Sequence, residues 1–404
     1  TYIQNLAGAL TINISGNTVQ NNYQGNGTTT ATGTMTGILN SVSNTTVGAV
    51  LNLNNNTVSN LVRSQSLAGT GQMMGIQVSG GNTTSNLYSN NVNNLTNNTT
   101  SSTNAGITFS PTVTIVNIYN NTVINILRTA GNTTGATYGI LATNSSAVCN
   151  VYGNTVYNIN NSAATTTSSA TYGYYNFGSG TVAENFYNNT IYNISCSGAS
   201  ATGVTIGANI GSGGSPSKEI YNNLIYNITG RGQTGGLRCD YIGTANIYRN
   251  YIRNILSNTV ATTPASYGLL IGANGTSTTR NTYNNVIHEI YAPLNNTTLS
   301  VVGIWINGGV ATRVYYNSVY LDATSSGTNF HTAALWTSVT PTIDMRNNIL
   351  INKSTPNGSG LSVAYQRSST TIATHQSTSD RNNLYAGATG PTRVIFFDGT
   401  NSDQ

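Results

Sequence analysis

Apolar and polar residues alternate along this chain in short runs, and one run returns at a nearly fixed interval. Its fullest copy is residues 188–194, Asn-Asn-Thr-Ile-Tyr-Asn-Ile. Aligning the copies on the second Asn of the pair gives twelve anchors that are 27 to 39 residues apart. The anchors are Asn17, Asn56, Asn90, Asn121, Asn154, Asn189, Asn223, Asn250, Asn285, Asn317, Asn348 and Asn383. A period of this size indicates a solenoid or a propeller.

Apolar residues also keep fixed offsets from the anchor. Around Asn154, for example, Val151 stands three positions before it, Val156 two after it and Ile159 five after it. Upstream of the anchors, a Gly followed by an apolar residue predicts the opening of a further strand. These glycines are Gly37, Gly75, Gly106, Gly139, Gly203, Gly236, Gly268, Gly303 and Gly360.

These offsets predict three short strands in each copy, so that one copy forms one turn of a coil. The fold class is therefore all-β: a single right-handed parallel β-helix of eleven or twelve turns of about 33 residues. Asn, Thr, Ser and Gly dominate the chain and are poor helix formers. A β-propeller, the alternative, needs four strands and about 40 residues or more in each copy.

We predict one continuous solenoid over residues 1–404, with three grades of regularity. Residues 1–55 form looser first turns, 56–320 regular turns, and 321–404 degenerate turns that lead toward another module. Both ends lie inside the repeat without a polar cap, so we expect a segment of a longer protein. Thr- and Ser-rich inserts, such as residues 160–171 and 257–266, are expected as loops at one corner.

The anchor asparagines are predicted to form a structural ladder from turn to turn. A carboxamide both donates and accepts hydrogen bonds, and Asn tolerates the left-handed conformation of a corner. A catalytic or ligand-binding role is the alternative. The ladder is expected to comprise Asn56, Asn90, Asn121, Asn154, Asn189, Asn223, Asn250, Asn285, Asn317 and Asn348.

A tyrosine stands two positions before the anchor in eight consecutive copies. The adjacent apolar position points inward, so this tyrosine stripe is expected to point outward: Tyr88, Tyr119, Tyr152, Tyr187, Tyr221, Tyr248, Tyr283 and Tyr315. Arg346 and Arg381 are expected to continue it. The stripe is either ordinary strand surface or a binding surface that stacks on sugar rings or a partner. A shorter set comprises Tyr157, Tyr192, Tyr226, Tyr320, His288 and Arg253.

Charged residues make up only 6% of the chain, against about a quarter in an ordinary soluble domain. This composition favours an extracellular, secreted or cell-surface protein. The net charge of +5 rests on 14 cations without a basic run, so nucleic-acid binding is not expected. Most of the later cations are expected to be solvated, with a mild anion-attracting face as the alternative: Arg249, Arg253, Arg280, Arg313, Arg346 and Arg381. No apolar run is long enough for a transmembrane helix, so direct membrane insertion is not expected.

A polysaccharide-cleaving β-helix needs carboxylates that converge from adjacent turns. The chain has nine acids, and its nearest approach to a pair is Glu289 with Asp322, beside His288. They occupy different offsets, so we predict no catalytic residue, no metal and no cofactor. Cys149, Cys196 and Cys239 also differ in offset, which predicts neither a metal site nor a disulfide.

The repeated Asn-Asn-Thr-Val/Ile-Tyr-Asn-Ile copies span nearly the whole chain. Near its end they give way to residues 382–385, Asn-Asn-Leu-Tyr, and 397–400, Phe-Asp-Gly-Thr. These features resemble the Asn/Thr-rich β-helical repeat regions of large surface proteins exported by the type IX secretion system. The resemblance implies an exported multi-module protein at the cell surface or released from it, often an adhesin. The C-terminal sorting module of that family is not in this sequence.

Three classes of function follow from these features. We expect first an extracellular structural or adhesive rod that belongs to a filament or a large surface protein, with other copies or modules of that protein as partners. A carbohydrate-binding β-helix that uses the tyrosine stripe on glycans is second. A polysaccharide lyase or hydrolase is third.

Overall fold

The computed structural model describes residues 1–24, 33–66, 71–99, 103–129, 135–162, 170–178, 183–198, 203–211, 217–240, 243–272 and 279–404. Within these ranges the regular elements are all β-strands. The chain divides into two compact units, Thr1–Gly203 with Gly211–Pro216, and Val204–Ile210 with Ser217–Gln404. Each unit is a coil of three parallel sheets, here called A, B and C, so the predicted parallel β-helix with about 33 residues per turn is confirmed.

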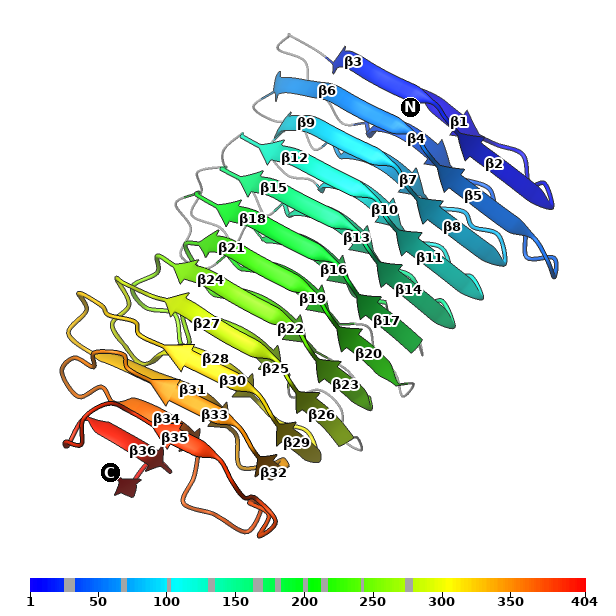
Figure 1. The fold of residues 1–404 in the computed structure, drawn as a ribbon. Coiled ribbons are helices and arrows are strands. Elements are labelled where there is room, and N and C mark those ends of the chain that lie inside the picture. Colours follow the sequence, from blue (N-terminus) through cyan, green and yellow to red (C-terminus); the bar gives the residue numbers. More distant parts are fainter. Residues whose placement is uncertain are drawn as a thin grey trace. The chain divides into compact units, whose positions relative to one another are not determined.

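In the first unit, the strands of each sheet are stacked in chain order (Figure 1). Sheet A comprises β1 (Ile3–Asn5), β4 (Met35–Asn40), β7 (Met73–Val78), β10 (Asn104–Phe109), β13 (Thr137–Ala142) and β16 (Thr171–Asn176). Sheet B comprises β2 (Thr11–Ser15), β5 (Val50–Asn54), β8 (Thr84–Tyr88), β11 (Ile115–Tyr119), β14 (Val148–Tyr152) and β17 (Ala183–Tyr187). Sheet C comprises β3 (Thr18–Gln24), β6 (Thr57–Ser66), β9 (Asn91–Thr99), β12 (Thr122–Arg128), β15 (Thr155–Asn161) and β18 (Thr190–Cys196).

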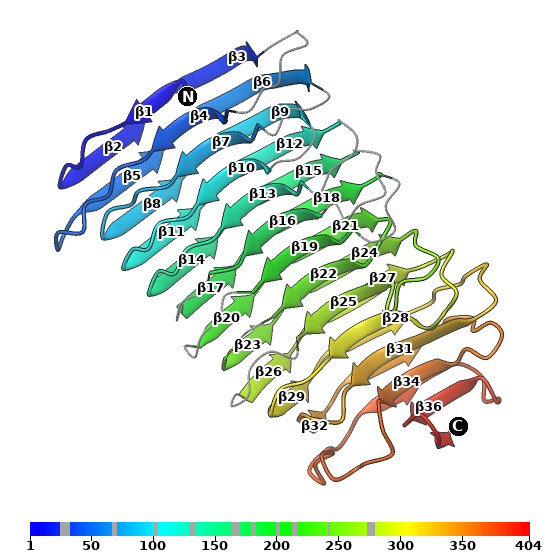
Figure 2. The ribbon, with the colours of Figure 1, turned by 180° about the vertical axis from the view of Figure 1, so that it is seen from behind.

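The second unit repeats this order, and the reverse view in Figure 2 shows its sheet A. Sheet A comprises β19 (Thr205–Ile210), β22 (Thr234–Cys239), β25 (Ser266–Ile271), β28 (Thr297–Ile306), β31 (Phe330–Thr337), β34 (Ser362–Arg367), β36 (Arg393–Phe397) and the short antiparallel β37 (Ser402–Asp403). Sheet B comprises β20 (Lys218–Tyr221), β23 (Ala245–Tyr248), β26 (Thr279–Tyr283), β29 (Ala311–Tyr315) and β32 (Thr342–Arg346). Sheet C comprises β21 (Leu224–Gly230), β24 (Tyr251–Ser257), β27 (Val286–Tyr291), β30 (Ser318–Leu321), β33 (Ile349–Asn352) and β35 (Asn383–Tyr385).

The apolar offsets of the sequence form the core of each coil. In the first unit Ile118 pairs with Val151 in sheet B, and Val123 with Val156 in sheet C. All four side chains are buried. Cys149, Cys196 and Cys239 are buried thiols.

The two residues of each Asn-Asn pair have different tasks. The first takes the left-handed conformation at the corner between sheets B and C, as Asn120 (φ 52°) and Asn188 (φ 54°) do. The second, the anchor, is buried and forms the ladder. The corner conformation predicted for the anchors therefore belongs to the residue before them. A further left-handed residue, such as Asn158 (φ 55°), bends the strands of sheet C from β3 to β27.

Asn154 shows how the inner asparagine ladder works. Its Oδ1 accepts from the backbone N of Asn121 (3.0 Å) and from Asn121 Nδ2 (3.0 Å). Its own Nδ2 donates to Ile118 O (2.9 Å) and to Asn189 Oδ1 (3.0 Å). Both hydrogens and both lone pairs of the carboxamide are thus used inside the protein. The structural role predicted for the anchors is what this geometry provides.

The last anchor lies one residue earlier than the sequence alignment predicts. Asn348 donates its backbone N–H (3.1 Å) and its Nδ2 (2.8 Å) to Asn382 Oδ1, so Asn382, not Asn383, continues the ladder. Asp380 pairs with Arg346, and Arg381 takes the left-handed corner (φ 54°). The tyrosine stripe therefore continues to Arg346 but not to Arg381.

The recurrent glycines occupy a position inside the strands of sheet A at which neighbouring atoms leave no room for a side chain. A Cβ on Gly139 would overlap Val156 Cγ1 and lie 2.5 Å from Gly173 O. Two glycines of the predicted set lie elsewhere. In β19 the position belongs to Gly207, not Gly203, and in β34 Gly360 precedes the strand.

Arg280, expected on the surface, is buried in the second unit. Its Nη1 donates to Gly272 O (2.5 Å) and Gly308 O (3.3 Å). Arg63, Arg128 and Arg367 are buried as well. The prediction of a solvated side chain was therefore wrong for Arg280, which lies inside the coil and donates to backbone carbonyls. The loop expected at 160–171 lies mostly outside the described residues.

Replacing Asn154 by Ala should lower the free energy of unfolding by about 2–4 kcal/mol, because buried donors of Asn121 and the carbonyl of Ile118 lose their partner. The outer, half-buried Asn150 is the control: Asn150→Ala should cost less than about 1 kcal/mol, because water replaces its bonds. Urea denaturation followed by circular dichroism measures both. Equal losses of unfolding free energy in the two variants would show that the inner ladder stabilises the fold no more than the outer row does.

Gly139→Ala should lower the unfolding temperature clearly, since overpacking a core costs about 1–3 kcal/mol and a carbonyl oxygen cannot move aside like a side chain. Gly390 is the matched control, because a Cβ added there would meet no atom within 4 Å. Calorimetry of Gly139→Ala and Gly390→Ala compares them, and an unchanged transition in the first variant would contradict the close approach of the sheets.

Candidate contact surface

The tyrosine stripe lies on the outer face of sheet B. Each tyrosine is the last residue of its strand and is half-buried, while the preceding residue in each of these strands is fully buried. Tyr119, for example, follows the buried Ile118 at the end of β11. Because side chains alternate along a strand, the tyrosines point away from the core.

In the first unit the four rings form a continuous face-to-face stack. The ring centroids of Tyr88 and Tyr119 are 4.8 Å apart with planes inclined by 5°. The next two pairs, Tyr119 with Tyr152 and Tyr152 with Tyr187, have spacings of 4.9 Å and inclinations of 5° and 4°. The ring spacing equals the distance between adjacent strands of a sheet.

The second unit has a shorter stack of three rings, and the stripe beyond it ends in a charged residue. Tyr221 and Tyr248 are 4.9 Å apart, and Tyr248 and Tyr283 are 4.8 Å apart. At Tyr315 the next position in the stripe is Arg346, whose guanidinium carbon lies 5.5 Å from the ring centroid. A cation over an aromatic face at this distance is attractive.

This stacking determines which chemistry the stripe offers. Inside a stack both faces of a ring are covered by the neighbouring tyrosines, so the ring edges and hydroxyls face outward. Sugar recognition by stacking needs an open ring face. The inner members of the stacks therefore present hydroxyl groups and edges, and not the flat aromatic platform expected from the sequence.

The hydroxyls of Tyr119 and Tyr248 are neutral at physiological pH, because the pKa of each is raised. Burial raises the pKa of Tyr119, and the neighbouring Tyr152 and Tyr88 raise it further. Burial also raises the pKa of Tyr248, followed by the carboxylate of Glu219. Each hydroxyl can therefore both donate and accept a hydrogen bond.

A second row of asparagines runs beside the stripe, two residues earlier in each strand. In the first unit Asn117 Nδ2 donates to Asn86 Oδ1 and Asn150 Nδ2 to Asn117 Oδ1, both at 2.8 Å. Asn185 continues the row by donating to Asn150 (2.7 Å). These bonds use one hydrogen and one lone pair of each carboxamide, which leaves the others for water or a ligand.

The same row in the second unit has a charged group at each end. Asn246 Nδ2 donates to Glu219 Oε1 (2.6 Å), and Asn281 Nδ2 donates to Asn246 Oδ1 (2.8 Å). Arg313 Nη1 donates to Asn281 Oδ1 (3.3 Å). An acceptor-only carboxylate thus begins the row and a donor-only guanidinium ends it.

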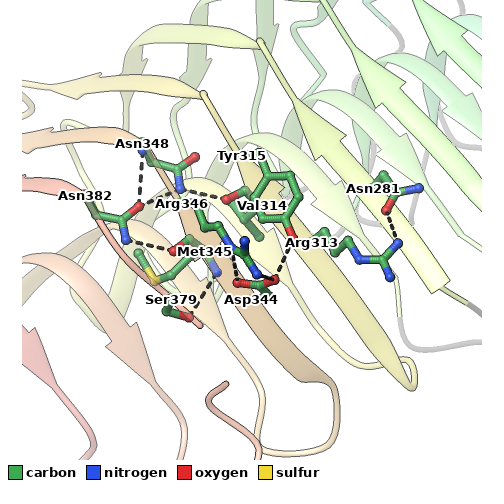
Figure 3. Close-up of polar contacts among 10 residues, drawn as sticks. All are labelled: Asn281, Arg313, Val314, Tyr315, Asp344, Met345, Arg346, Asn348, Ser379 and Asn382. Atoms are coloured by element: carbon green, nitrogen blue, oxygen red, sulfur yellow. Dashed lines mark hydrogen bonds and ion pairs between the residues drawn. The ribbon is translucent and has the colours of Figure 1, made fainter. Parts of the chain in front are cut away.

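Figure 3 shows the charged end of the stripe. Tyr315 donates its hydroxyl to Asp344 Oδ2 (2.5 Å), and Arg346 binds both carboxylate oxygens, with Nε to Oδ1 at 2.9 Å and Nη2 to Oδ2 at 2.7 Å. Burial alone would raise the pKa of Asp344, but the hydrogen bonds from Arg346 and Tyr315 outweigh it and the pKa is lowered. The two-pronged contact fixes Arg346 next to the last ring.

The shorter aromatic set lies on sheet C. Tyr157 stacks on Tyr192 with a centroid spacing of 4.6 Å in the first unit. In the second unit Arg253 lies 4.9 Å from the ring centroid of Tyr226, and Arg253, His288 and Tyr320 are in register.

Glu289 and Asp322 come from adjacent turns of the second unit. Glu289 lies 3.4 Å from His288 Nδ1 and 3.8 Å from Arg253 Nη1. It sits within β27, whereas Asp322 follows β30, so the two occupy different positions in their turns. Among the described residues no three His, Cys, Asp or Glu side chains gather into a possible metal site.

One aromatic cluster was missed by the sequence analysis. Trp305 of β28 and Trp336 of β31 are in register, with ring centroids 6.2 Å apart and planes inclined by 78°. They pack against Tyr267, Leu270 and Val302. The equivalent position in other turns is occupied by other residue types, so the repeat pattern does not indicate this cluster. The only signal in the sequence is that these are the chain's two tryptophans.

In comparisons with known proteins, no family model, no curated protein and no solved structure matches this chain. Nor do the described residues include a helix that is long and apolar enough to span a membrane.

Asp344→Asn should destabilise the protein at pH 7 and not at low pH. A carboxyl group whose pKa is lowered by folding stabilises the fold above its unfolded pKa of about 4, and this contribution is lost as the pH falls through the folded pKa. Thermal unfolding of wild type and Asp344→Asn between pH 7 and pH 2 measures the difference. Asp322→Asn is the control, and a gap that persists at pH 2 would contradict the role of the ion pair.

Proposed function

We propose that this chain is a non-catalytic structural or adhesive segment of an extracellular filament or large surface protein. The tyrosine stripe and the asparagine row beside it form its contact surface. The observation that carries the proposal is the saturation of the inner ladder, in which Asn154 satisfies all its hydrogen-bonding groups within the protein.

A coil held in this way needs few charges. The core is mainly apolar, with a few buried charges such as Arg280, the ladder is neutral, and only 6% of the residues are charged. Its stability therefore depends little on ionic strength, because screening acts on charges and not on neutral hydrogen bonds. Such independence suits a protein outside the cell, where the surroundings vary.

The contact surface has the features of an interface between neutral partners. In the first unit, sheet B presents tyrosines and asparagines without a charged side chain in either row. Tyrosine is enriched at interfaces because it offers a large apolar area together with a hydroxyl. Other copies or modules of the same surface protein are the proposed partners. The resemblance to type IX secretion substrates supports an adhesin-like role at the cell surface.

Carbohydrate binding is the second candidate, and the outer asparagine row favours it. Asn117 and Asn150 keep one hydrogen and one lone pair each for an external group. A glycan would then be held by hydrogen bonds from carboxamides and tyrosine hydroxyls, and not by stacking on ring faces.

The triple variant Tyr119→Ser, Tyr152→Ser, Tyr187→Ser tests the contact surface. It should fold and lose at least about tenfold in binding to the surface of the source cells, because an aromatic interface residue contributes about 1–2 kcal/mol. Tyr157→Ser with Tyr192→Ser, on sheet C, is the control and should bind as wild type. Flow cytometry with the labelled protein measures both.

A glycan array separates the two candidates. Binding to glycans that falls in the triple variant would favour the carbohydrate-binding module, whereas cell binding without glycan binding favours the adhesive segment. Cell binding that is unchanged in the triple variant would reject the stripe as the contact surface.

A further inference from the structure

A cavity of about 410 Å³ lies within the last turns of the second unit. Arg367 of β34 lines it, together with Tyr365, His375 and Ser379. Apolar side chains form most of the remaining wall: Met345, Ile372, Leu384, Ile395 and Phe396. A volume of this size and a mostly apolar wall with a few polar groups are typical of small-molecule sites.

The guanidinium of Arg367 is the unusual group in this wall. The side chain is only 1% exposed, and it has no carboxylate partner among the described residues. Nη1 donates to the hydroxyl of Tyr365 (3.2 Å), and Nη2 donates to Thr371 O (3.2 Å) and Thr374 Oγ1 (2.6 Å). Nε is buried and has no hydrogen-bond partner in the described part of the chain.

A buried positive charge with an unused donor is costly unless an anion is close. Apart from Asp403, an exposed residue of β37, the other described groups around the cavity do not supply one. His375 lies beside Tyr365, with Nδ1 3.3 Å from its hydroxyl, and burial followed by the nearby Arg367 guanidinium lowers its pKa. The imidazole is therefore neutral at pH 7. Asp344 acts on His375 from a distance, and its carboxylate is already bound by Arg346 and Tyr315.

Burial without a carboxylate is not sufficient by itself, because Arg280 is buried too and donates to backbone carbonyls. What distinguishes Arg367 is that it lines an open cavity with apolar walls. A ligand there can bring the missing negative charge and cover the apolar side chains at the same time.

We propose that this cavity binds a small organic monocarboxylate with an apolar body. The carboxylate lies against the Arg367 guanidinium and supplies the missing negative charge, and the apolar part packs against Met345, Leu384 and Phe396. Among the described residues that line the cavity, Asp403, an exposed residue of β37, is the one carboxylate. Its charge opposes the ligand, so the bound carboxylate lies at the Arg367 end.

Benzoate and its neutral analogue benzamide are suitable probes, because they share shape and differ in charge. Titration calorimetry with the full chain should give saturable binding of benzoate and much weaker binding of benzamide. Arg367→Gln should weaken benzoate binding at least about tenfold, since hydrogen bonds to charged groups contribute about 1.5–3 kcal/mol. The equally buried Arg280→Gln is the matched control and should bind benzoate within about twofold of wild type.

Two measurements keep the test decisive if Arg367→Gln does not fold. Asp403→Asn removes the opposing charge at an exposed position and should tighten benzoate binding. In wild type, benzoate should shift the ring signals of His375 in the NMR spectrum and leave those of His288, on sheet C, unchanged. Absence of binding, equal binding of benzamide, or a shift at His288 alone would overturn the proposal. None of these outcomes bears on the tyrosine stripe, so this test is independent of the proposed function.

Discussion

The inner asparagine ladder is the interaction on which the coil depends, because no other residue type can make the same hydrogen bonds at the corner between sheets B and C. Every turn brings the same backbone N–H and the same carbonyl into a place that water does not reach. Only a short carboxamide offers two donors and two acceptors at this length. Asp would stack like charges in the interior, Ser lacks the second donor, and Gln carries an extra methylene that the corner has no room to fold.

The ladders also have a direction. Asn154 of the inner ladder donates toward the following turn, to Asn189, whereas Asn150 of the outer row donates toward the preceding one, to Asn117. A row with a direction has two unlike ends: one lacks a donor and the other an acceptor. In the second unit Glu219 and Arg313 supply the groups that these ends require. Charged residues, scarce in this chain, thus occur where the neutral pattern stops.

The fold could be predicted because a parallel coil places equivalent residues of successive turns next to one another. Residues that align in the repeat are therefore close to the residues that are in contact. The prediction of the last anchor was wrong because two identical residues stand next to each other in that turn. Asn382 and Asn383 are identical, and only the main-chain bonds from Asn348 decide between them. The repeat made no prediction for Arg367, whose partners Thr371 and Thr374 lie in the insert that follows β34. The stripe was predicted by position, but the use of its ring faces in stacking depends on side-chain rotation, which periodicity does not encode.

The equivalence of successive turns has a consequence for inheritance. If recombination between repeats in the gene removed residues 122–154, Asn121 would meet Asn189 in place of Asn154, with the same donors and acceptors in the same places. Tyr119 would likewise meet Tyr187. A change of one whole turn is therefore nearly neutral for the remaining turns, whereas a change in length of one residue inside a strand moves its side chains to the opposite face. Such a gene can lengthen or shorten its product by whole repeats, and lineages that carry it are expected to differ in repeat number more readily than in the sequence of a single turn.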